Sequence, residues 1–155
     1  IGSREMGIRN SPSKISIFFH RRFFMKSAFT FLKKAVVFYV ATIEGDQPKL
    51  RPFGIIANFK DRLYICTKDD KDCFREMEKN PKIEIAAMFG EDWIRVTGKV
   101  VRDFDQKAKE AVLEQNPHAQ AIYSASDPHF AVLYFQKAHA DIYRSTGKIE
   151  TLPLV

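Results

Sequence analysis

The sequence predicts a mainly β protein with short helices, arranged as an antiparallel barrel. Apolar runs rich in β-branched and aromatic residues recur along the chain, and tight turns such as Glu44-Gly45-Asp46 and Gly90-Glu91-Asp92 join several of them. The helical segments between these runs are short, so the strands follow in hairpin order and not in the alternation of a parallel sheet. At 155 residues the chain is long enough for one domain with a substantial core. These observations favour an antiparallel barrel.

The first part of the chain is expected to form a short helix and three strands. The segments are, in order, Lys26–Lys34 (helix) and Val36–Ile43, Lys49–Phe59 and Leu63–Thr67 (strands). Val36–Ile43 is almost continuously apolar, which is typical of a strand buried on both faces. Pro52 removes a backbone donor and Gly54 removes a side chain, so the second strand is expected to bulge or bend there.

A second helix and a second hairpin are expected next. Asp69 or Asp70 can cap the helix, and Asn80-Pro81 ends it. Its apolar stripe is Cys73, Phe74 and Met77. The hairpin consists of Lys82–Phe89 and Trp93–Asp103. Alternation along its second strand places Trp93, Arg95, Thr97 and Lys99 on one face, and Ile94, Val96, Gly98 and Val100 on the other.

The last third is expected to add a third helix and the closing strands. Asp105 can cap a helix that runs to Gln115, before Asn116-Pro117. The residues predicted to face inward are Ala108, Ala111 and Val112. Ala119–Ser126 is ambiguous between helix and loop. The closing segments are a strand pair, Phe130–Phe135 and Ala138–Arg144, and a short final strand after Ser145-Thr146-Gly147-Lys148.

The basic charge of +6 is concentrated at the N-terminus and does not indicate a nucleic-acid partner. Residues 1–24 hold five basic residues against one acidic residue, and the other 131 residues carry only +2. No apolar stretch reaches the ~18–20 residues of a membrane span, so no membrane partner is expected.

Residues 1–24 differ in composition from the rest and are interpreted as a leader. They lack the apolar region and cleavage site of a signal peptide, which favours a cytoplasmic location. The leader is expected to be foreign or translated upstream sequence, with the native start at Met25 and a single domain over residues 25–155. The alternative is a genuine basic arm, in which Ile15–Phe19 and Phe23-Phe24 pack on the body as a short strand or helix.

The cysteines and histidines do not form a metal-binding pattern. Cys66 and Cys73 are interpreted as buried free thiols of a reducing compartment. The four histidines show no ligand spacing, so no metal site is expected.

A hydroxyl and three cations are expected to meet near the ends of neighbouring strands and at a helix start. They are Arg51, Thr67, Lys68 and Lys71. A guanidinium can bind phosphate oxygens through two hydrogen bonds, and lysines and a helix N-terminus add positive charge, so this group suits a phosphate-bearing ligand. In the alternative interpretation Arg51 and Lys71 are solvated and Lys71 pairs with a neighbouring aspartate. The acidic residues Asp69, Asp70 and Asp72 would repel a phosphate unless they point away.

Four segments carry a resemblance to a known family. They are ATIEGDQPKLRPFGI (Ala41–Ile55), TKDDKD (Thr67–Asp72), NPKIEIAA (Asn80–Ala87) and WIRVTGKVV (Trp93–Val101). In this order they resemble the pyridoxamine 5'-phosphate oxidase-related family of FMN-binding split β-barrels, which work as homodimers. The likeness covers nearly everything from Met25 to the C-terminus.

The resemblance implies a set of cofactor-binding residues. Arg51 corresponds to the family's phosphate-binding strand arginine, and the residues around Thr67 to its partners after the third strand. Trp93 corresponds to a residue that faces the flavin of the partner subunit, although it can equally plug the dimer interface or a barrel end. The implied FMN site is Arg51, Pro52, Phe53, Gly54, Ile55, Cys66, Thr67, Lys68, Lys71 and Trp93.

The resemblance stops short of the true vitamin B6 oxidases. Ser145–Val155 lacks the Trp and the Arg-His segment of those enzymes, so the chain is more similar to small bacterial flavin-dependent reductases. The expected function is an FMN oxidoreductase of unknown substrate, with a nicotinamide or another electron donor. Tyr123, His129 and His139 can transfer protons but are interpreted as structural, so no catalytic residue is assigned. The alternatives are a non-enzymatic flavin- or heme-binding or sequestering module, and a degenerate barrel without cofactor.

Overall fold

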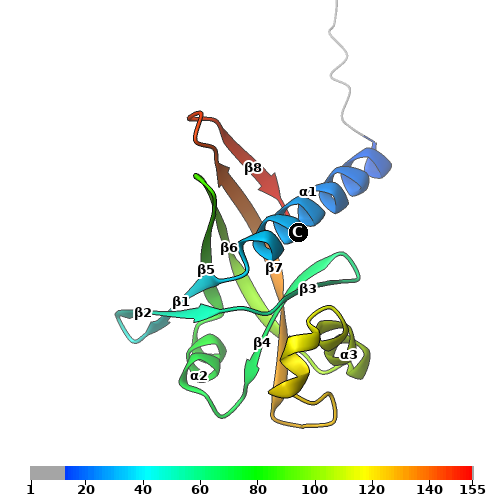
Figure 1. Cartoon of the computed structure of the whole chain (residues 1–155), viewed down its shortest axis with the longest axis vertical. Helices are drawn as coiled ribbons and strands as arrows, with labels where there is room; N and C mark the ends of the chain where they lie inside the picture. The colour runs from blue at the N-terminus through cyan, green and yellow to red at the C-terminus, as the bar shows by residue number, and fades with distance from the viewer. Residues whose placement is uncertain (1–12, 155) are drawn as a thin grey trace, which may run out of the picture.

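The computed structural model describes residues 13–154 and shows one mainly β unit (Figure 1). The elements in chain order are α1 (Lys14–Ala35), β1 (Phe38–Glu44), β2 (Gln47–Phe53), β3 (Ile56–Phe59), β4 (Arg62–Lys68), α2 (Asp72–Lys79), β5 (Lys82–Phe89), β6 (Asp92–Asp103), α3 (Gln106–Glu114), the 3-10 helix η1 (Pro117–Ala121), β7 (Phe130–Tyr143) and β8 (Ile149–Pro153).

All neighbouring strands are antiparallel, which confirms the predicted fold class. The sheet order is β2-β1-β5-β6-β7-β4-β3, and β8 also pairs with β7. The two end strands, β2 and β3, are consecutive in the chain and separated only by Gly54 and Ile55. The sheet therefore curls until its two end strands meet at this link. β2 and β3 are not paired with each other, so the barrel is not closed, as expected for a split barrel.

The predicted second strand breaks completely where a bend was expected. Lys49–Phe59 forms parts of two strands, since β2 ends at Phe53 and β3 starts at Ile56. β2 pairs with β1 and β3 pairs with β4. The bend predicted from Pro52 and Gly54 is present. At this bend the chain also passes from pairing with β1 to pairing with β4.

The predicted strand pair near the C-terminus is wrong, because β7 is one continuous strand of 14 residues. Its first half pairs with β4 and its second half pairs with β8, along the same edge. Gln136-Lys137 resembled a turn in the sequence. In the structure Lys137 has a φ of 51° at a register shift opposite Gly98, so the polar pair forms a bulge.

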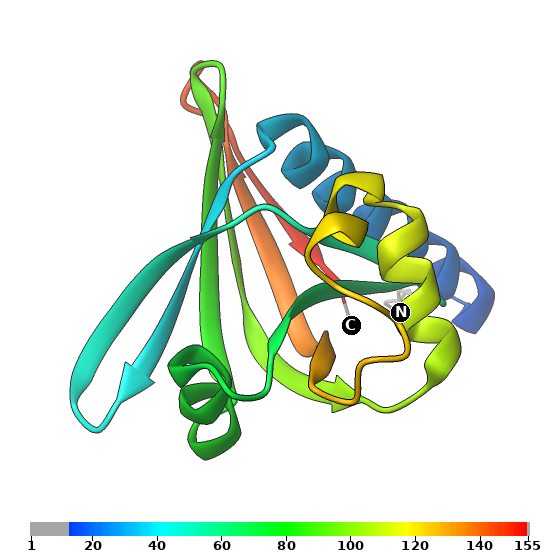
Figure 2. The same ribbon diagram turned by 60° about the horizontal axis from the view of Figure 1, so that its bottom comes forward.

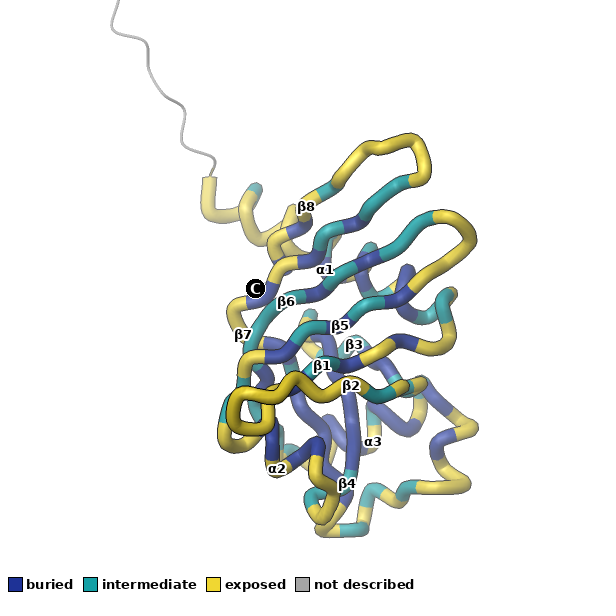
Figure 3. Tube along the Cα trace, turned by 90° about the vertical axis from the view of Figure 1, so that its left-hand side faces the viewer, coloured by how far each residue is buried: buried dark blue, intermediate teal, exposed yellow. Residues whose placement is uncertain are grey.

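Two apolar cores lie on opposite faces of β4. Leu63 and Ile65 join the larger core beneath α1, while Tyr64 and Cys66 join a smaller core beneath α3 and η1. β1 is buried on one face only, because Tyr39 is 48% exposed between buried Phe38 and Val40. The prediction that Val36–Ile43 is buried on both faces is therefore wrong within one chain. The outer face that β1 shares with β5 and β6 is visible in Figure 3.

The first helix is much longer than predicted and includes half of the proposed leader. α1 runs from Lys14, where Ser13 caps it, through Met25 without a break. Ile15, Phe18 and Phe19 are exposed, and Met25 is the first fully buried residue. Residues 14–23 thus continue the helix beyond the core, whereas Phe24 packs against the core, as the alternative of a packed arm predicted for this residue. The start of the proposed leader, residues 1–12, lies outside the described residues.

The other two helices flank the two cores (Figure 2). α2 packs on β1, and α3 on β3. The stripe of Cys73, Phe74 and Met77 is buried as predicted, but Lys71 and not Asp69 or Asp70 is the N-cap. Asp105 caps α3 as predicted. Ala108 and Val112 face inward, whereas Ala111 is only partly buried because Lys109 and Leu113 occupy the rest of that face.

Candidate ligand-binding pocket

A pocket of about 340 Å³, here called the split pocket, lies where the two ends of the sheet meet. It receives residues from β2 and its link to β3, from the end of β4, from the start of α2 and from the η1 segment. The lining residues are Arg51, Pro52, Phe53, Gly54, Ile55, Cys66, Thr67, Lys71, Cys73, His118, Ile122 and Tyr123. Eight of the ten predicted site residues are among them, and Lys68 and Trp93 are not.

The start of α2 gives the pocket its positive end. Lys71 is the N-cap of this helix and its side chain makes no capping hydrogen bond. Unpaired N–H groups and the helix dipole make such an end favourable for an anion. Beside it, buried Thr67 places Oγ1 3.4 Å from Cys73 Sγ. A cation, a hydroxyl and a helix N-terminus therefore adjoin the same cavity.

Arg51 lines the pocket but its guanidinium is held by protein groups. It donates to both carboxylate oxygens of Glu76, at 2.9 and 3.3 Å, and to Thr42 Oγ1 at 2.6 Å. The Glu76 side chain is only 7% exposed. Arg51 is thus neither solvated, as the alternative interpretation held, nor free to bind a phosphate through both of its terminal nitrogens. Its arrangement anchors α2 to β1 and β2.

Glu76 was missed from the sequence for a clear reason. A glutamate in the middle of a short charged helix is expected to face solvent. Only its spacing of three residues from buried Cys73 could have suggested an inward position.

Two of the three acidic residues near Lys71 are held in ion pairs outside the pocket. Asp69 accepts from Arg102 Nη1 at 3.1 Å and lies 2.8 Å from His129 Nδ1, and Asp72 pairs with Arg75. The hydrogen bond with His129 is the main reason that the pKa of Asp69 is lowered. None of the three acidic residues lines the cavity. The expected repulsion of a phosphate by Asp69 and Asp72 is therefore countered by their ion pairs.

Burial keeps two titratable side chains of the pocket, Cys66 and Tyr123, neutral. It raises the pKa of the Cys66 thiol to about 12, despite the nearby positive charge of Lys71. It is also the largest cause of the raised pKa of Tyr123. Both groups are protonated at neutral pH, so neither acts as a nucleophile or base there.

Four lining residues, Cys73 of α2 and three from the η1 segment, were not predicted as site residues. His118, Ile122 and Tyr123 come from η1 and the loop after it. The sequence of this segment was ambiguous between helix and loop, so nothing placed it beside β4. The Tyr123 ring stacks on Phe130 at 4.9 Å, which fixes that wall to the smaller core.

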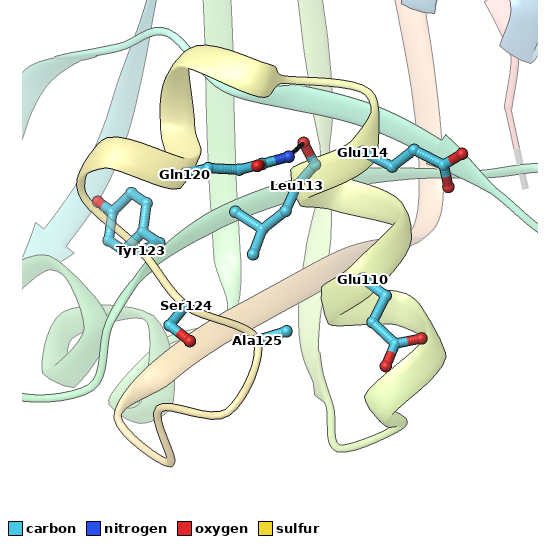
Figure 4. A pocket seen from close by; sticks show the side chains of 7 residues that line it. All are labelled: Glu110, Leu113, Glu114, Gln120, Tyr123, Ser124 and Ala125. Carbon is cyan, nitrogen blue, oxygen red and sulfur yellow. Dashed lines mark hydrogen bonds between the residues drawn. The ribbon is translucent and has the colours of Figure 1, made fainter.

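Tyr123 also borders a neighbouring groove of about 550 Å³ between α3 and the loop after η1 (Figure 4). Its other lining residues are Glu110, Leu113, Glu114, Gln120, Ser124 and Ala125. Gln120 donates to the Leu113 carbonyl at 3.3 Å and so joins η1 to α3 beside the groove. This groove contains none of the predicted site residues.

Trp93 and Lys68 lie apart from the split pocket. Trp93 stacks on Tyr143 on the outer face of the sheet, with centroids 4.0 Å apart and planes inclined by 7°. Arg95 covers the Trp93 ring and pairs with Glu84 at 2.8 Å. Lys68 pairs with Asp127 at 3.5 Å. A single chain therefore does not bring Trp93 to the other predicted residues.

Within residues 13–154 no group of three or more His, Cys, Asp or Glu side chains is arranged to hold a metal ion. In the same part of the chain no helix is both long and apolar enough to cross a membrane.

Comparison with known proteins links the chain to one family. A family model described as pyridoxamine 5'-phosphate oxidase matches residues 24–141. The crystal structure of a NimC/NimA family protein from Clostridium acetobutylicum is 44% identical, with a TM-score of 0.83, over 86% of this chain and 94% of that one. No curated protein sequence matches.

Two more distant structures share the fold. General Stress Protein 26 from Bacillus anthracis is 16% identical with a TM-score of 0.65, over 86% of this chain and 99% of that one. A heme binding protein from Mycobacterium smegmatis is 16% identical with a TM-score of 0.68, over 84% of this chain and 57% of that one.

Proposed function

Because the chain belongs to the pyridoxamine 5'-phosphate oxidase family, we propose that it is a flavoprotein that binds FMN in the split pocket and acts as an oxidoreductase. The observation that carries this proposal is the convergence of eight predicted positions on one cavity, from β2 and its link to β3, from β4 and from the N-cap of α2.

The residues of the pocket fit the two ends of FMN. Lys71, the Thr67 hydroxyl and the N-terminus of α2 offer charge and donors for the phosphate. Phe53, Ile55 and Ile122 offer apolar surface for the ring system and exclude water from it. Arg51 acts mainly through Glu76, by holding α2 and therefore Lys71 in position.

Bound FMN would supply the redox chemistry, since the Cys66 thiol and the Tyr123 phenol of the pocket are protonated. The chain's own residues bind the cofactor, orient it and keep its surroundings apolar. The electron donor we propose is a nicotinamide. Two buried free thiols, Cys66 and Cys73, favour a reducing, cytoplasmic setting.

We also propose that the protein is a homodimer that uses the outer face of the sheet. Val37, Tyr39 and Met88 are exposed there, and the Trp93–Tyr143 stack lies on the same face. Large exposed apolar surfaces of this kind favour association. In such a dimer Trp93 of one subunit can lie near the split pocket of the other. A Tyr39→Glu variant should sediment as a monomer at micromolar concentration, and a wild-type monomer would contradict the proposal.

The phosphate assignment is tested by titrating FMN and riboflavin with fluorescence detection. Lys71→Ala should weaken FMN binding about ten- to a hundredfold, the loss expected for a charge-assisted contact of ~1.5–3 kcal/mol. Riboflavin affinity should not change. Lys79→Ala, at the other end of α2, is the matched control. Equal affinities of the wild type for FMN and riboflavin would contradict the assignment.

Oxidoreductase activity requires that the bound flavin accept electrons. NADH or NADPH should bleach the flavin absorbance of the purified protein, and air should restore it. Reduction by dithionite but by neither nicotinamide would favour the alternative of a binding or sequestering module. The distant likeness to a heme binding protein supports that alternative, and the absorption spectrum of protein purified from cells separates flavin from heme.

A further inference from the structure

A second pocket, here called the lysine pocket, lies on the outer face of the sheet over β1, β5, β6 and β7. It has a volume of about 420 Å³. Its lining residues are Ala41, Thr42, Ile43, Pro48, Lys82, Ile83, Glu84, Thr97, Gly98, Lys99 and Lys137. It shares no lining residue with the split pocket, and none of the residues named for the proposed dimer interface (Val37, Tyr39, Met88, Trp93 and Tyr143) lines it.

The bulge in β7 adds one of the lysines to this face. The β6–β7 register shifts between Thr97 and Lys99, so that β7 has an extra residue opposite Gly98. Gln136 and Lys137 are consequently both exposed, where regular alternation would expose only one. A side chain at Gly98 would lie 2.7 Å from the Ala138 Cβ, so the tight packing of the bulge requires glycine there.

The charges of this pocket are unbalanced. Lys82 lies directly opposite Lys99 in the β5–β6 ladder, and like charges in that position repel. Among residues 13–154 no carboxylate forms an ion pair with Lys82, Lys99 or Lys137. The only acidic residue of the lining, Glu84, is held by Arg95 at 2.8 Å. An anion bound between the lysines would relieve the repulsion.

Part of the remaining lining is apolar. Ala41, Ile43 and Pro48 from the β1–β2 hairpin form the wall beside the lysines. We propose that the lysine pocket binds a small ligand that carries a phosphate or carboxylate group on an apolar body. The anionic group lies against Lys82, Lys99 and Lys137, and the body lies against Ile43 and Pro48.

The test is calorimetric titration of the full chain with phenyl phosphate at low salt. Lys99→Gln and Lys137→Gln should each weaken binding about tenfold, as expected for the loss of one charge-assisted contact. Lys107→Gln, an exposed lysine of α3 outside the pocket, should leave it unchanged. If Lys107→Gln weakened phenyl phosphate binding as much as Lys99→Gln and Lys137→Gln do, binding would depend only on net charge and the proposal would be overturned.

Two further measurements separate this pocket from the split pocket and from a folding defect. Lys71→Gln should retain phenyl phosphate binding. If Lys71→Gln lost binding while Lys99→Gln and Lys137→Gln retained it, the ligand would belong to the split pocket and the proposal would be overturned. Without ligand, Lys99→Gln should unfold at the same or a higher temperature than the wild type at low salt, because repulsion by Lys82 is removed. A lower unfolding temperature would contradict the proposed repulsion.

Inorganic phosphate should bind more weakly than phenyl phosphate, and equal binding would refute the apolar part of the site.

Discussion

β4 and β1 are both rich in apolar residues, yet only β4 is covered on both faces within the chain. The larger core covers Leu63 and Ile65 of β4, and the smaller core beneath α3 and η1 covers Tyr64 and Cys66. In β1 the inner residues Phe38 and Val40 are buried, whereas outer Tyr39 is 48% exposed.

The difference shows that an apolar strand does not specify what covers it. For β4 the second cover comes from segments 40 to 70 residues later in the chain, and this cover also forms one wall of the split pocket. For β1 no described segment supplies a second cover. In the proposed dimer the partner subunit supplies it, so the two strands would be stabilised by different means.

The largest expected effect distinguishes these two covers. Phe130→Ala removes a fully buried ring from the core on β4 and should lower the free energy of unfolding by about 3–5 kcal/mol. Tyr39→Ala should change the free energy of unfolding of a monomer by only about 0.5 kcal/mol. Denaturant unfolding at several protein concentrations measures both. If the outer face is a dimer interface, Tyr39→Ala also removes the concentration dependence, whereas Phe130→Ala does not.

A smaller difference is expected between ion pairs on the inner and outer sides of the sheet. Glu76→Ala leaves the Arg51 guanidinium unpaired and should cost about 2–3 kcal/mol, less than a fully buried pair because the Arg51 side chain is 24% exposed. Glu84→Ala breaks the exposed pair with Arg95 and should cost about 0.2–1 kcal/mol. Equal losses in thermal or denaturant unfolding would mean that Glu76 does not anchor α2.

The smallest expected effect is a pH dependence at the end of β4, where Asp69 pairs with His129. The hydrogen bond with Asp69 raises the pKa of His129 above its usual 6.5. The stabilisation is therefore fully present below pH 6.5 and is lost as the pH rises through the raised pKa. The pKa of Asp69 is lowered, so the stabilisation that its carboxylate provides is fully present above pH 3.8. This stabilisation is lost as the pH falls through the lowered pKa.

The Asp69–His129 pair should make the free energy of unfolding of the wild type larger than that of His129→Gln. The stability gap between them should shrink as the pH rises above 6.5 and through the raised pKa of His129. A gap that stays constant over this range would show that the Asp69–His129 pair does not contribute to folding.

Much of the local structure could be predicted from the sequence. The β5–β6 hairpin around Gly90, the stop at Asn80-Pro81 and the Asp105 cap depend on turn and capping chemistry within a few residues, and all three were correct. The errors arose where contacts between segments far apart in the sequence determine the local structure. Gln136-Lys137 formed a bulge because β6 continues opposite it, and Arg51 turned to Glu76 because α2 packs on β1.

The sequence by itself determined the antiparallel class, several turns and helix ends, and most residues of the split pocket, because periodicity, glycine turns and the family motifs are local in the chain. Only the tertiary structure decided which strand is covered twice, that β2 and β3 part at Gly54, and that Trp93 lies away from Lys71. These features depend on burial and charge pairing between segments far apart in sequence. Such contacts exist only once the sheet has curled and its ends have met.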